Sequence, residues 1–304
     1  MENPLVALSN ELAAAVERAG QTVVTVHGRP RVPSSGVLWK EGVVVTADHT
    51  LRRDEELRIT LPDGQSVSAT LAGRDPGTDL AVLRTEQQQT PAAQLQDIED
   101  LKPGNLALVV GRSHETGVSA ALGVISTVSG PWHTWRGGKI DQFVRLDVGL
   151  YPGASGGAVV DASGRLVGIA TGGLSRTSAL AIPRVTVTRV VEALLKSGRV
   201  ARGYLGLGLQ PVVVPEHLRT ELAITQKTGL IALSVEPDAP AGKAGIVIGD
   251  VLLTLNGNAV GDTDDVQAVL GPEFVGKTVD CTILRGGARA NVQITIGERP
   301  QRRC

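Results

Sequence analysis

The sequence predicts a mostly β protein with two domains, a larger β domain followed by a small α+β module. With 304 residues, the chain has about twice the length of a common domain. Between residues 22 and 182 it is a series of short β-rich runs, separated by turn signals such as Asp63-Gly64 and uninterrupted by a helix-length pattern. This pattern excludes alternating strands and helices, and it favours an antiparallel barrel or sandwich.

Helices are expected on either side of this β series. Residues 4–19 space their apolar side chains along one helix face, with Asn3 as the N-cap and Gly20 as the stop. Residues 184–197 return to the same helical period, and Gly198 ends it. The two helical patterns therefore mark where the β domain begins and ends.

A short polar connection from Gly198 to Gly203 is the expected domain boundary. Beyond it, strand patterns mix with two short helical patterns, at 215–223 and 263–270, as in a small α+β module. The predicted organisation is an N-terminal helix at 1–20, a β domain at 21–198 and the module at 203–300.

Composition and charge exclude several classes of function. The 30 basic and 31 acidic side chains leave a net charge of −1, without the basic excess of a nucleic-acid binder. Cys281 and Cys304 form no C-x-x-C motif and the five histidines form no H-x-x-H pair, so no metal site is expected. No apolar stretch approaches the ~20 residues of a membrane helix. The start, Met-Glu-Asn-Pro, is not a signal peptide, so as written the chain is expected in the cytoplasm.

The clearest sign of chemistry is Ser155, at the centre of the segment GASGG at 153–157. Flanking glycines allow a tight, exposed turn whose N–H groups point toward whatever the hydroxyl attacks. The segment also fits the G-x-S-x-G elbow of α/β-hydrolases, which include lipases and esterases. That elbow runs into a helix and needs a later histidine. Here two strand patterns follow the serine, and the only later histidine is His217, in the other domain.

The other two groups of a catalytic triad lie upstream. His49 ends one β-rich run and Asp79 opens another, so the chain order is that of chymotrypsin-like enzymes. A serine hydroxyl is a poor nucleophile until an imidazole removes its proton, and a carboxylate fixes the imidazole tautomer. The backbone N–H groups of Gly153 and Ser155 are the expected oxyanion hole, which contributes about 3–4 kcal/mol in the transition state. We therefore predict His49, Asp79 and Ser155 as catalytic residues.

Together these motifs resemble the HtrA/Deg family of serine proteases, in which a trypsin-like peptidase domain carries a PDZ domain. TADH at 46–49 resembles the family's histidine motif, TDLAVL at 78–83 its aspartate motif and PGASGGAVV at 152–160 its serine motif. LAIP at 180–183 is similar to the strand end beside the family's specificity pocket. The resemblance covers nearly the whole chain.

The resemblance implies a chymotrypsin-like double β-barrel and an ATP-independent endopeptidase that acts on unfolded or damaged proteins without a cofactor. It also implies an extracytoplasmic location and a homo-oligomer, a trimer in the family, although the N-terminal helix lacks the aromatic residues that family trimers use. Asp48 and Ala154 replace asparagine of the family pattern, and Ala158 replaces proline. Asp48 is thus a second carboxylate that could compete for His49. A non-catalytic peptide-binding scaffold with a misaligned triad is the alternative function.

The resemblance also locates a specificity pocket. In trypsin-like enzymes the residue six before the serine lies at the pocket base, and here it is Gly149, followed by Leu150. With Leu180 from the LAIP strand, these residues offer no carboxylate to a basic substrate side chain. Cleavage after small or medium apolar residues is therefore expected.

Residues 203–297 resemble a bacterial PDZ domain. YLGL at 204–207 is similar to the carboxylate-binding loop, and TDDVQAVL at 263–270 is similar to the helix beside the peptide groove. Such a module binds an extended peptide C-terminus as an additional strand. The expected groove residues are Tyr204, Leu205, Gly206, Leu207, Leu209, Val266 and Leu270.

One further motif suggests a nucleotide. Residues 271–278 fit the phosphate-binding pattern G-x-x-x-x-G-K-[ST], which has to leave a strand and open a helix. Here the segment leaves a helical pattern and enters a strand pattern, and Pro272 and Phe274 occupy loop positions. No nucleotide is therefore expected.

Overall fold

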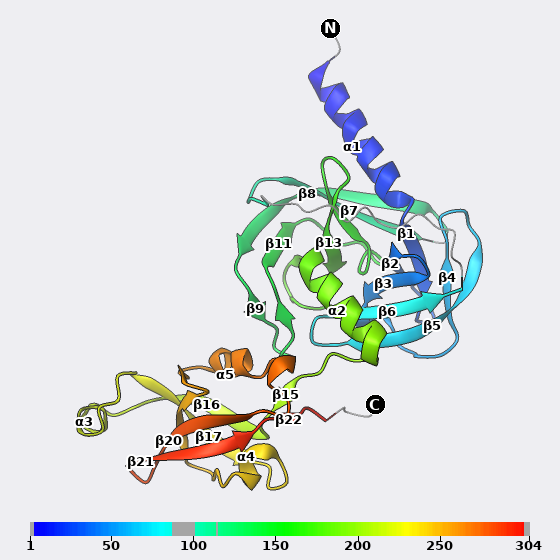
Figure 1. The fold of residues 1–304 in the computed structure, drawn as a ribbon. Coiled ribbons are helices and arrows are strands. Elements are labelled where there is room, and N and C mark those ends of the chain that lie inside the picture. Colours follow the sequence, from blue (N-terminus) through cyan, green and yellow to red (C-terminus); the bar gives the residue numbers. More distant parts are fainter. Residues whose placement is uncertain (1–2, 87–100, 114, 301–304) are drawn as a thin grey trace. The chain divides into compact units, whose positions relative to one another are not determined.

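The computed structural model describes residues 3–86, 101–113 and 115–300, and the chain divides into two compact units, Met1–Val200 and Ala201–Cys304 (Figure 1). Six strands of the first unit close into a barrel in the order β1-β2-β3-β6-β5-β4. They are β1 (Val23–His27), β2 (Ser34–Lys40), β3 (Val43–Ala47), β4 (Leu57–Thr60), β5 (Ser66–Asp75) and β6 (Leu80–Thr85). The barrel closes because β1 pairs with β4 as well as with β2.

A second closed barrel follows in the same unit, in the order β11-β14-β13-β12-β7-β8. Its strands are β7 (Leu106–Ser113), β8 (Gly117–Ser129), β11 (Phe143–Asp147), β12 (Ala158–Asp161), β13 (Leu166–Thr171) and β14 (Ala179–Pro183). A small hairpin of β9 (Trp132–His133) and β10 (Lys139–Ile140) stands between β8 and β11. The predicted mostly β fold with two barrels is confirmed.

The apolar runs of these strands are continuous because both of their faces are buried. Successive side chains of a strand point to opposite faces. Val44 of β3 packs inside the first barrel, whereas its neighbour Val45 packs in a cluster shared with the second barrel. In β7, Val109 lies inside the second barrel and Val110 joins the same shared cluster. The shared cluster therefore fixes the two barrels against each other.

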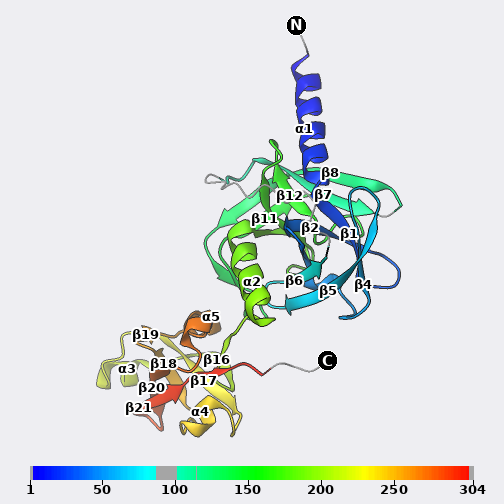
Figure 2. The same ribbon diagram turned by 45° about the vertical axis from the view of Figure 1, so that its right-hand side comes forward.

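Two helices cover this unit, close to the predicted limits. They are α1 (Pro4–Gly20) and α2 (Arg184–Ser197). The Asn3 side chain caps α1 by accepting a hydrogen bond from the N–H of Leu5 at 3.0 Å. The first turns of α1 lie away from the barrels, and Leu5 is 75% exposed (Figure 2). No helix among the described residues is long and apolar enough to span a bilayer.

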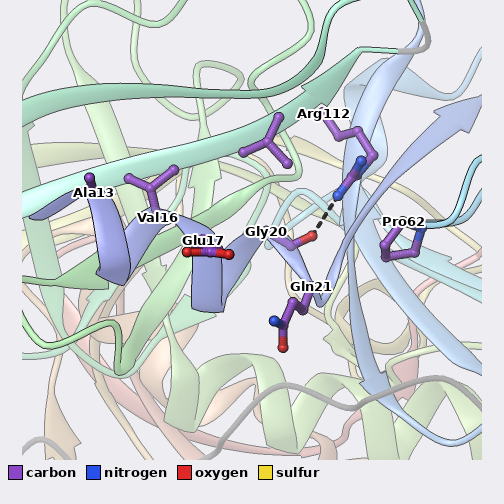
Figure 3. Close-up of a pocket in the computed structure, with 8 residues that line it drawn as sticks. Ala13, Val16, Glu17, Gly20, Gln21, Pro62 and Arg112 are labelled. Atoms are coloured by element: carbon purple, nitrogen blue, oxygen red, sulfur yellow. Dashed lines mark hydrogen bonds between the residues drawn. The ribbon is translucent and has the colours of Figure 1, made fainter.

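The end of α1 is anchored through Arg112 of β7. Its guanidinium donates to the carbonyl of Gly20 at 2.7 Å (Figure 3). It also donates to the carbonyl of Val23 at 2.6 Å. Burial lowers the pKa of Arg112, but the group stays a cation at neutral pH. A cavity of about 480 Å³ lies beside it, lined by Glu17 and Val16 (Figure 3) and also by Val118.

The second unit is built on a six-stranded antiparallel sheet in the order β16-β17-β18-β20-β21, with β19 paired to β18 and short helices beside it. Its helices are α3 (Glu216–Glu221), α4 (Pro240–Lys243) and α5 (Thr263–Val269). Its strands are β15 (Gly203–Tyr204), β16 (Leu207–Val213), β17 (Thr228–Val235), β18 (Val251–Leu255), β19 (Asn258–Ala259), β20 (Thr278–Arg285), β21 (Ala288–Thr295) and β22 (Gly297–Glu298). Strand β16 lies at the edge of the sheet, so one side of its backbone is open for pairing.

Candidate active site

His49 lies in a short 3₁₀ turn, η1 (Asp48–Thr50), directly after β3. The turn is closed by the N–H of Leu51, which donates to the Asp48 carbonyl at 3.0 Å. The Thr50 hydroxyl reaches the Ala47 carbonyl at 2.7 Å and the Ser34 hydroxyl at 2.9 Å. The side chain of His49 is 33% exposed, so the ring is anchored on one side and accessible on the other.

Asp79 lies at the end of a tight loop before β6. Its φ of 58° is in the left-handed region, which aspartate tolerates better than most residues with a Cβ. Asp75 closes this loop by accepting from the Thr78 hydroxyl at 2.7 Å and from the Gly77 N–H at 3.3 Å. The loop presents the Asp79 carboxylate, which is 3% exposed, toward η1.

The His49 ring and the Asp79 carboxylate form a close pair. Nδ1 of His49 lies 2.8 Å from Oδ2 and 3.0 Å from Oδ1 of Asp79. The backbone N–H of His49 also donates to Oδ1, at 2.9 Å. A ring whose Nδ1–H is donated in this way leaves Nε2 as the proton acceptor. The geometry thus prepares His49 to act as a base through Nε2.

Ser155 directly follows a tight turn that requires a left-handed backbone conformation at Gly153. The N–H of Ala154 donates to the carbonyl of Tyr151 at 3.0 Å, with Pro152 and Gly153 between them. Gly153 has a φ of 92°, as the third position of a type II turn requires. A residue with a side chain would be strained there, which explains the glycine of the motif.

The oxyanion donors predicted from the sequence are available on this turn. Within residues 3–86, 101–113 and 115–300, neither the Gly153 N–H nor the Ser155 N–H donates to an acceptor. The carbonyls beside them are both fixed by Ser35 of β2. Its hydroxyl donates to the Gly153 carbonyl at 2.8 Å and its N–H donates to the Ser155 carbonyl at 3.2 Å. The turn therefore holds two free N–H groups next to the serine.

Two consecutive glycines after β13 connect the serine to the histidine–aspartate pair. The N–H of Gly172 lies 3.4 Å from the Ser155 hydroxyl oxygen. A methyl group built on Gly173 would lie 2.6 Å from Nδ1 of His49 and 2.7 Å from Oδ2 of Asp79. The structure thus brings the three predicted residues to one place. Among the described residues, no hydrogen bond yet joins the Ser155 hydroxyl to the His49 ring.

Thr171 is a site residue that the sequence did not reveal. This fully buried side chain donates its hydroxyl proton to Oδ2 of Asp79 and accepts the N–H of Gly173 at 2.9 Å. It ends the apolar run LVGIAT, where a threonine is an ordinary strand residue. Only the closure of the second barrel against the first shows that it faces Asp79.

Asp48, which could compete for His49 according to the sequence, has a different partner in the structure. The Asp48 carboxylate is 4% exposed and its Oδ1 lies 2.5 Å from Nε of Arg74, in β5. Burial raises the pKa of Asp48 above its usual 3.8, nearby Asp79 and Asp75 add to the rise, and Arg74 opposes it. The Arg74 guanidinium therefore binds the Asp48 carboxylate, although Asp48 is the neighbour of His49 in the sequence.

The three residues predicted for the specificity pocket differ in their surroundings. Leu150 lies near the serine, because a methyl group built on Gly172 would contact both side chains. It would be 3.7 Å from Cδ1 of Leu150 and 3.8 Å from the Ser155 oxygen. Leu180 is 3% exposed in β14, where it pairs in register with Thr171. Gly149 is exposed, and no atom lies within 4 Å of a methyl group built on it.

The second unit has a groove between the edge strand β16 and α5. All seven predicted groove residues line a cavity of about 140 Å³ there, and Arg202, Gln267 and Arg299 join them. Gly206 turns the loop before β16 with a φ of 76°, and a methyl group on it would meet Ala239. An open strand edge beside a helix suits the addition of an extended peptide.

Comparisons with known proteins match a different family to each of the two units. Residues 34–169 match the family of trypsin-like peptidase domains and residues 203–296 match that of PDZ domains. The chain is 30% identical over 277 residues to a probable periplasmic serine endoprotease, DegP-like, of Halomonas elongata, covering 90% of this chain and 57% of that protein. A protein of the same name from Brucella suis is 32% identical over 282 residues, covering 90% and 54%. The chain thus spans a little more than half the length of these relatives.

Solved structures match over nearly the full chain. The HtrA-type protease AlgW with a decapeptide is 26% identical with a TM-score of 0.79, covering 96% of this chain and 99% of that one. The serine endoprotease from Yersinia pestis is 30% identical with a TM-score of 0.78, covering 95% and 98%. The chain therefore belongs to the HtrA/Deg family of serine proteases, in which a PDZ domain follows a trypsin-like peptidase domain.

Proposed function

We propose that this chain is a serine endopeptidase whose catalytic triad is His49, Asp79 and Ser155. The observation that carries the proposal is that Gly172 and Gly173, neighbours in the chain, contact the serine hydroxyl and the histidine–aspartate pair respectively. Nucleophile, base and orienting carboxylate therefore share one site, which the chemistry of a triad requires.

The proposed reaction is acyl transfer in two steps. Nε2 of His49 takes the Ser155 proton while the hydroxyl oxygen attacks the peptide carbonyl, and Asp79 stabilises the imidazolium. The N–H groups of Gly153 and Ser155 stabilise the oxyanion. His49 then gives the proton to the leaving amine, and water activated by the same imidazole hydrolyses the acyl-enzyme. Every group that these steps use belongs to the chain, so the reaction draws on neither ATP nor a cofactor.

The proposed substrates are unfolded or damaged polypeptides outside the cytoplasm. The relatives that support this are named probable periplasmic serine endoproteases. Leu150 beside Ser155 supports cleavage after small or medium apolar residues. Profiling with a peptide library tests this specificity, and a strong preference for basic residues would contradict it.

Replacement of the nucleophile tests the proposed activity. Ser155→Ala is expected to abolish both casein hydrolysis and labelling by a serine-directed fluorophosphonate. If the wild type is never labelled, the alternative of a non-catalytic peptide-binding scaffold is correct. Turnover of simple esters without proteolysis would instead indicate a lipase or esterase.

The groove of the second unit is proposed to bind peptide C-termini. Its apolar wall of Leu207, Leu209 and Val266 fits an apolar terminal side chain, and the solved HtrA-type protease with a decapeptide supports peptide binding. Peptides with free apolar C-termini are expected to bind with micromolar Kd, and Val266→Glu is expected to abolish this binding. Equal affinity for amidated peptides would contradict capture of the carboxylate.

A homo-oligomer is also proposed, with a trimer as the family form. The support is the exposed start of α1, where Leu5 is 75% and Leu8 46% exposed. Burial of such side chains against other copies is favourable by about 1.5–3 kcal/mol each. Light scattering of the wild type and of a Leu5→Lys variant tests this, and a monomeric wild type would refute it.

A further inference from the structure

Three buried carboxylates belong to the turn that carries His49 and to the loop that leads to Asp79. Asp48, Asp75 and Asp79 are all less than 5% exposed. Asp79 pairs with His49, and Asp75 accepts hydrogen bonds from its own loop. Asp48 precedes His49 in the chain, and its charged partner is Arg74. A buried carboxylate needs such a partner, because an unpaired charge is costly away from water.

The Arg74 guanidinium spans the whole turn that carries His49. Its Nε lies 2.5 Å from Oδ1 of Asp48, and one Nη donates to the carbonyl of Asp48 at 3.2 Å and to that of Leu51 at 3.1 Å. The other Nη reaches the exposed carboxylate of Asp54 at 2.7 Å. His49 stands between the two carbonyls, so one planar group holds the backbone on both sides of it. A lysine offers no such fork of donors.

We propose that Arg74 is a positioning residue for His49. It braces the η1 turn from Asp48 to Leu51, and it binds the Asp48 carboxylate so that Asp79 alone pairs with the imidazole. This inference rests on the proposed protease function, in which the direction of Nε2 toward Ser155 sets the rate. Without the Arg74 guanidinium, the buried Asp48 carboxylate would lose its cationic partner, and the ring N–H of the adjacent His49 would be the nearest replacement donor in the chain. Rotation of the His49 ring toward Asp48 would move Nε2 away from Ser155.

The test measures how fast each active serine reacts. Fluorophosphonate labelling of the full chain has an amplitude, which counts folded active sites, and a rate constant, which reports the reactivity of Ser155. Arg74→Gln is expected to lower the rate constant about 100-fold, the scale of a misplacement near 1 Å, at unchanged amplitude. The kcat for a peptide substrate should fall with it, while KM changes less than about twofold.

Two matched variants separate positioning from stability. Asp54→Asn removes the solvent-exposed partner of the same guanidinium, and it is expected to react like the wild type. Asp48→Asn in the Arg74→Gln background removes the unpaired negative charge of Asp48 and keeps the shape of its side chain. This double variant is expected to recover at least about tenfold in rate. Where Arg74→Gln fails to fold, Arg74→Lys is measured instead, with a loss of about tenfold expected.

The inference is overturned if Arg74→Gln, or Arg74→Lys in its place, labels as fast as the wild type. It is also overturned if only the amplitude falls, since that result describes a structural ion pair. A double variant no faster than Arg74→Gln would refute the role of Asp48. A wild type that is never labelled would refute the proposed function, and this inference with it.

Discussion

The hydroxyl of Ser35 donates a 2.8 Å hydrogen bond to the carbonyl of Gly153, and so joins a strand of the first barrel to the turn before Ser155. The same oxygen accepts the N–H of Arg112 at 3.0 Å. Arg112 also holds the end of α1 (Figure 3), so Ser35 and Arg112 together connect the turn before Ser155 to the N-terminal helix. Ser35 is fully buried, so no water can replace its hydrogen bonds without rearrangement.

Ser35→Ala is therefore expected to lower kcat by about 10–100-fold, because the Gly153 carbonyl loses its donor and the adjacent N–H loses its orientation. It should also cost about 1–3 kcal/mol of stability, since two backbone groups are left unpaired. Peptide hydrolysis and urea denaturation measure the two effects. Thr25→Val is the control, because this buried hydroxyl donates to the Arg112 carbonyl and does not touch the turn. An equal loss of kcat in Thr25→Val would contradict the role of Ser35.

Gly173→Ala is expected to reduce kcat/KM by at least about 100-fold. The added methyl group would lie 2.6 Å from Nδ1 of His49 and 2.7 Å from Oδ2 of Asp79, so the pair has to separate. Gly172→Ala is the neighbouring control, with its methyl group in ordinary contact 3.8 Å from the Ser155 oxygen. It should retain activity within about threefold of the wild type. The prediction is wrong if the two variants have similar kinetics.

Thr171→Val is expected to lower kcat about tenfold with KM nearly unchanged. The substitution removes the hydroxyl that donates to Asp79, a hydrogen bond to a charged group worth about 1.5–3 kcal/mol. Thr171→Ser keeps the hydroxyl and should stay close to the wild type. Steady-state kinetics of the three proteins distinguish loss of the hydroxyl from loss of packing. A defective Thr171→Ser with an active Thr171→Val would reverse the interpretation.

Acid is expected to weaken the second unit through Asp250. Burial raises the pKa of this carboxyl, but hydrogen bonds from Arg285 and from the Val247 N–H outweigh it and hold the pKa below its usual 3.8. The unfolded chain therefore takes up the proton first as the pH falls. The stabilisation is present above pH 3.8 and is lost as the pH falls through the lower folded value. Asp250→Asn should cost about 2 kcal/mol at pH 7 and progressively less below pH 3.8.

The reactivity of the Cys281 thiol reports the stability of the second unit in the intact chain. It is fully buried in the core of the second unit, and burial raises its pKa to about 12. Its reaction with a dithiodipyridine in urea, with Cys304 replaced by serine, reports the opening of that unit. Asp280→Asn removes an exposed charge from the same sheet and should change stability by less than about 0.5 kcal/mol at every pH. A difference between wild type and Asp250→Asn that does not shrink as the pH falls below 3.8 would refute the prediction.

The sequence was sufficient for the barrels and the two long helices, and it named the three residues of the proposed triad that the structure brings together. Short β-rich runs between turn signals predicted the strands, and the shared cluster between the barrels explains why both faces of β3 and β7 are apolar. The positions of His49 and Asp79 at strand ends were readable because strand ends are where side chains meet at one edge. The turn at Gly153 was readable because only glycine fits its backbone.

The supporting residues could not be predicted because their partners are far away in the chain. Thr171 reaches back 92 residues to Asp79, and Ser35 reaches forward 118 residues to Gly153. Neither residue type is unusual in a strand, so no local pattern marks it. The two-residue strands β9 and β10 were missed for another reason, since they are too short to show a period.

The split of the site between two separately closed barrels has a consequence for biosynthesis. The pair of His49 and Asp79 can form once the ribosome has made the first barrel, but Ser155 and Thr171 come only with the second barrel. A nascent chain therefore carries a base with nothing to deprotonate until the second barrel has been translated. The proposed protease is thus harmless to its own emerging segments until its last barrel strands have joined.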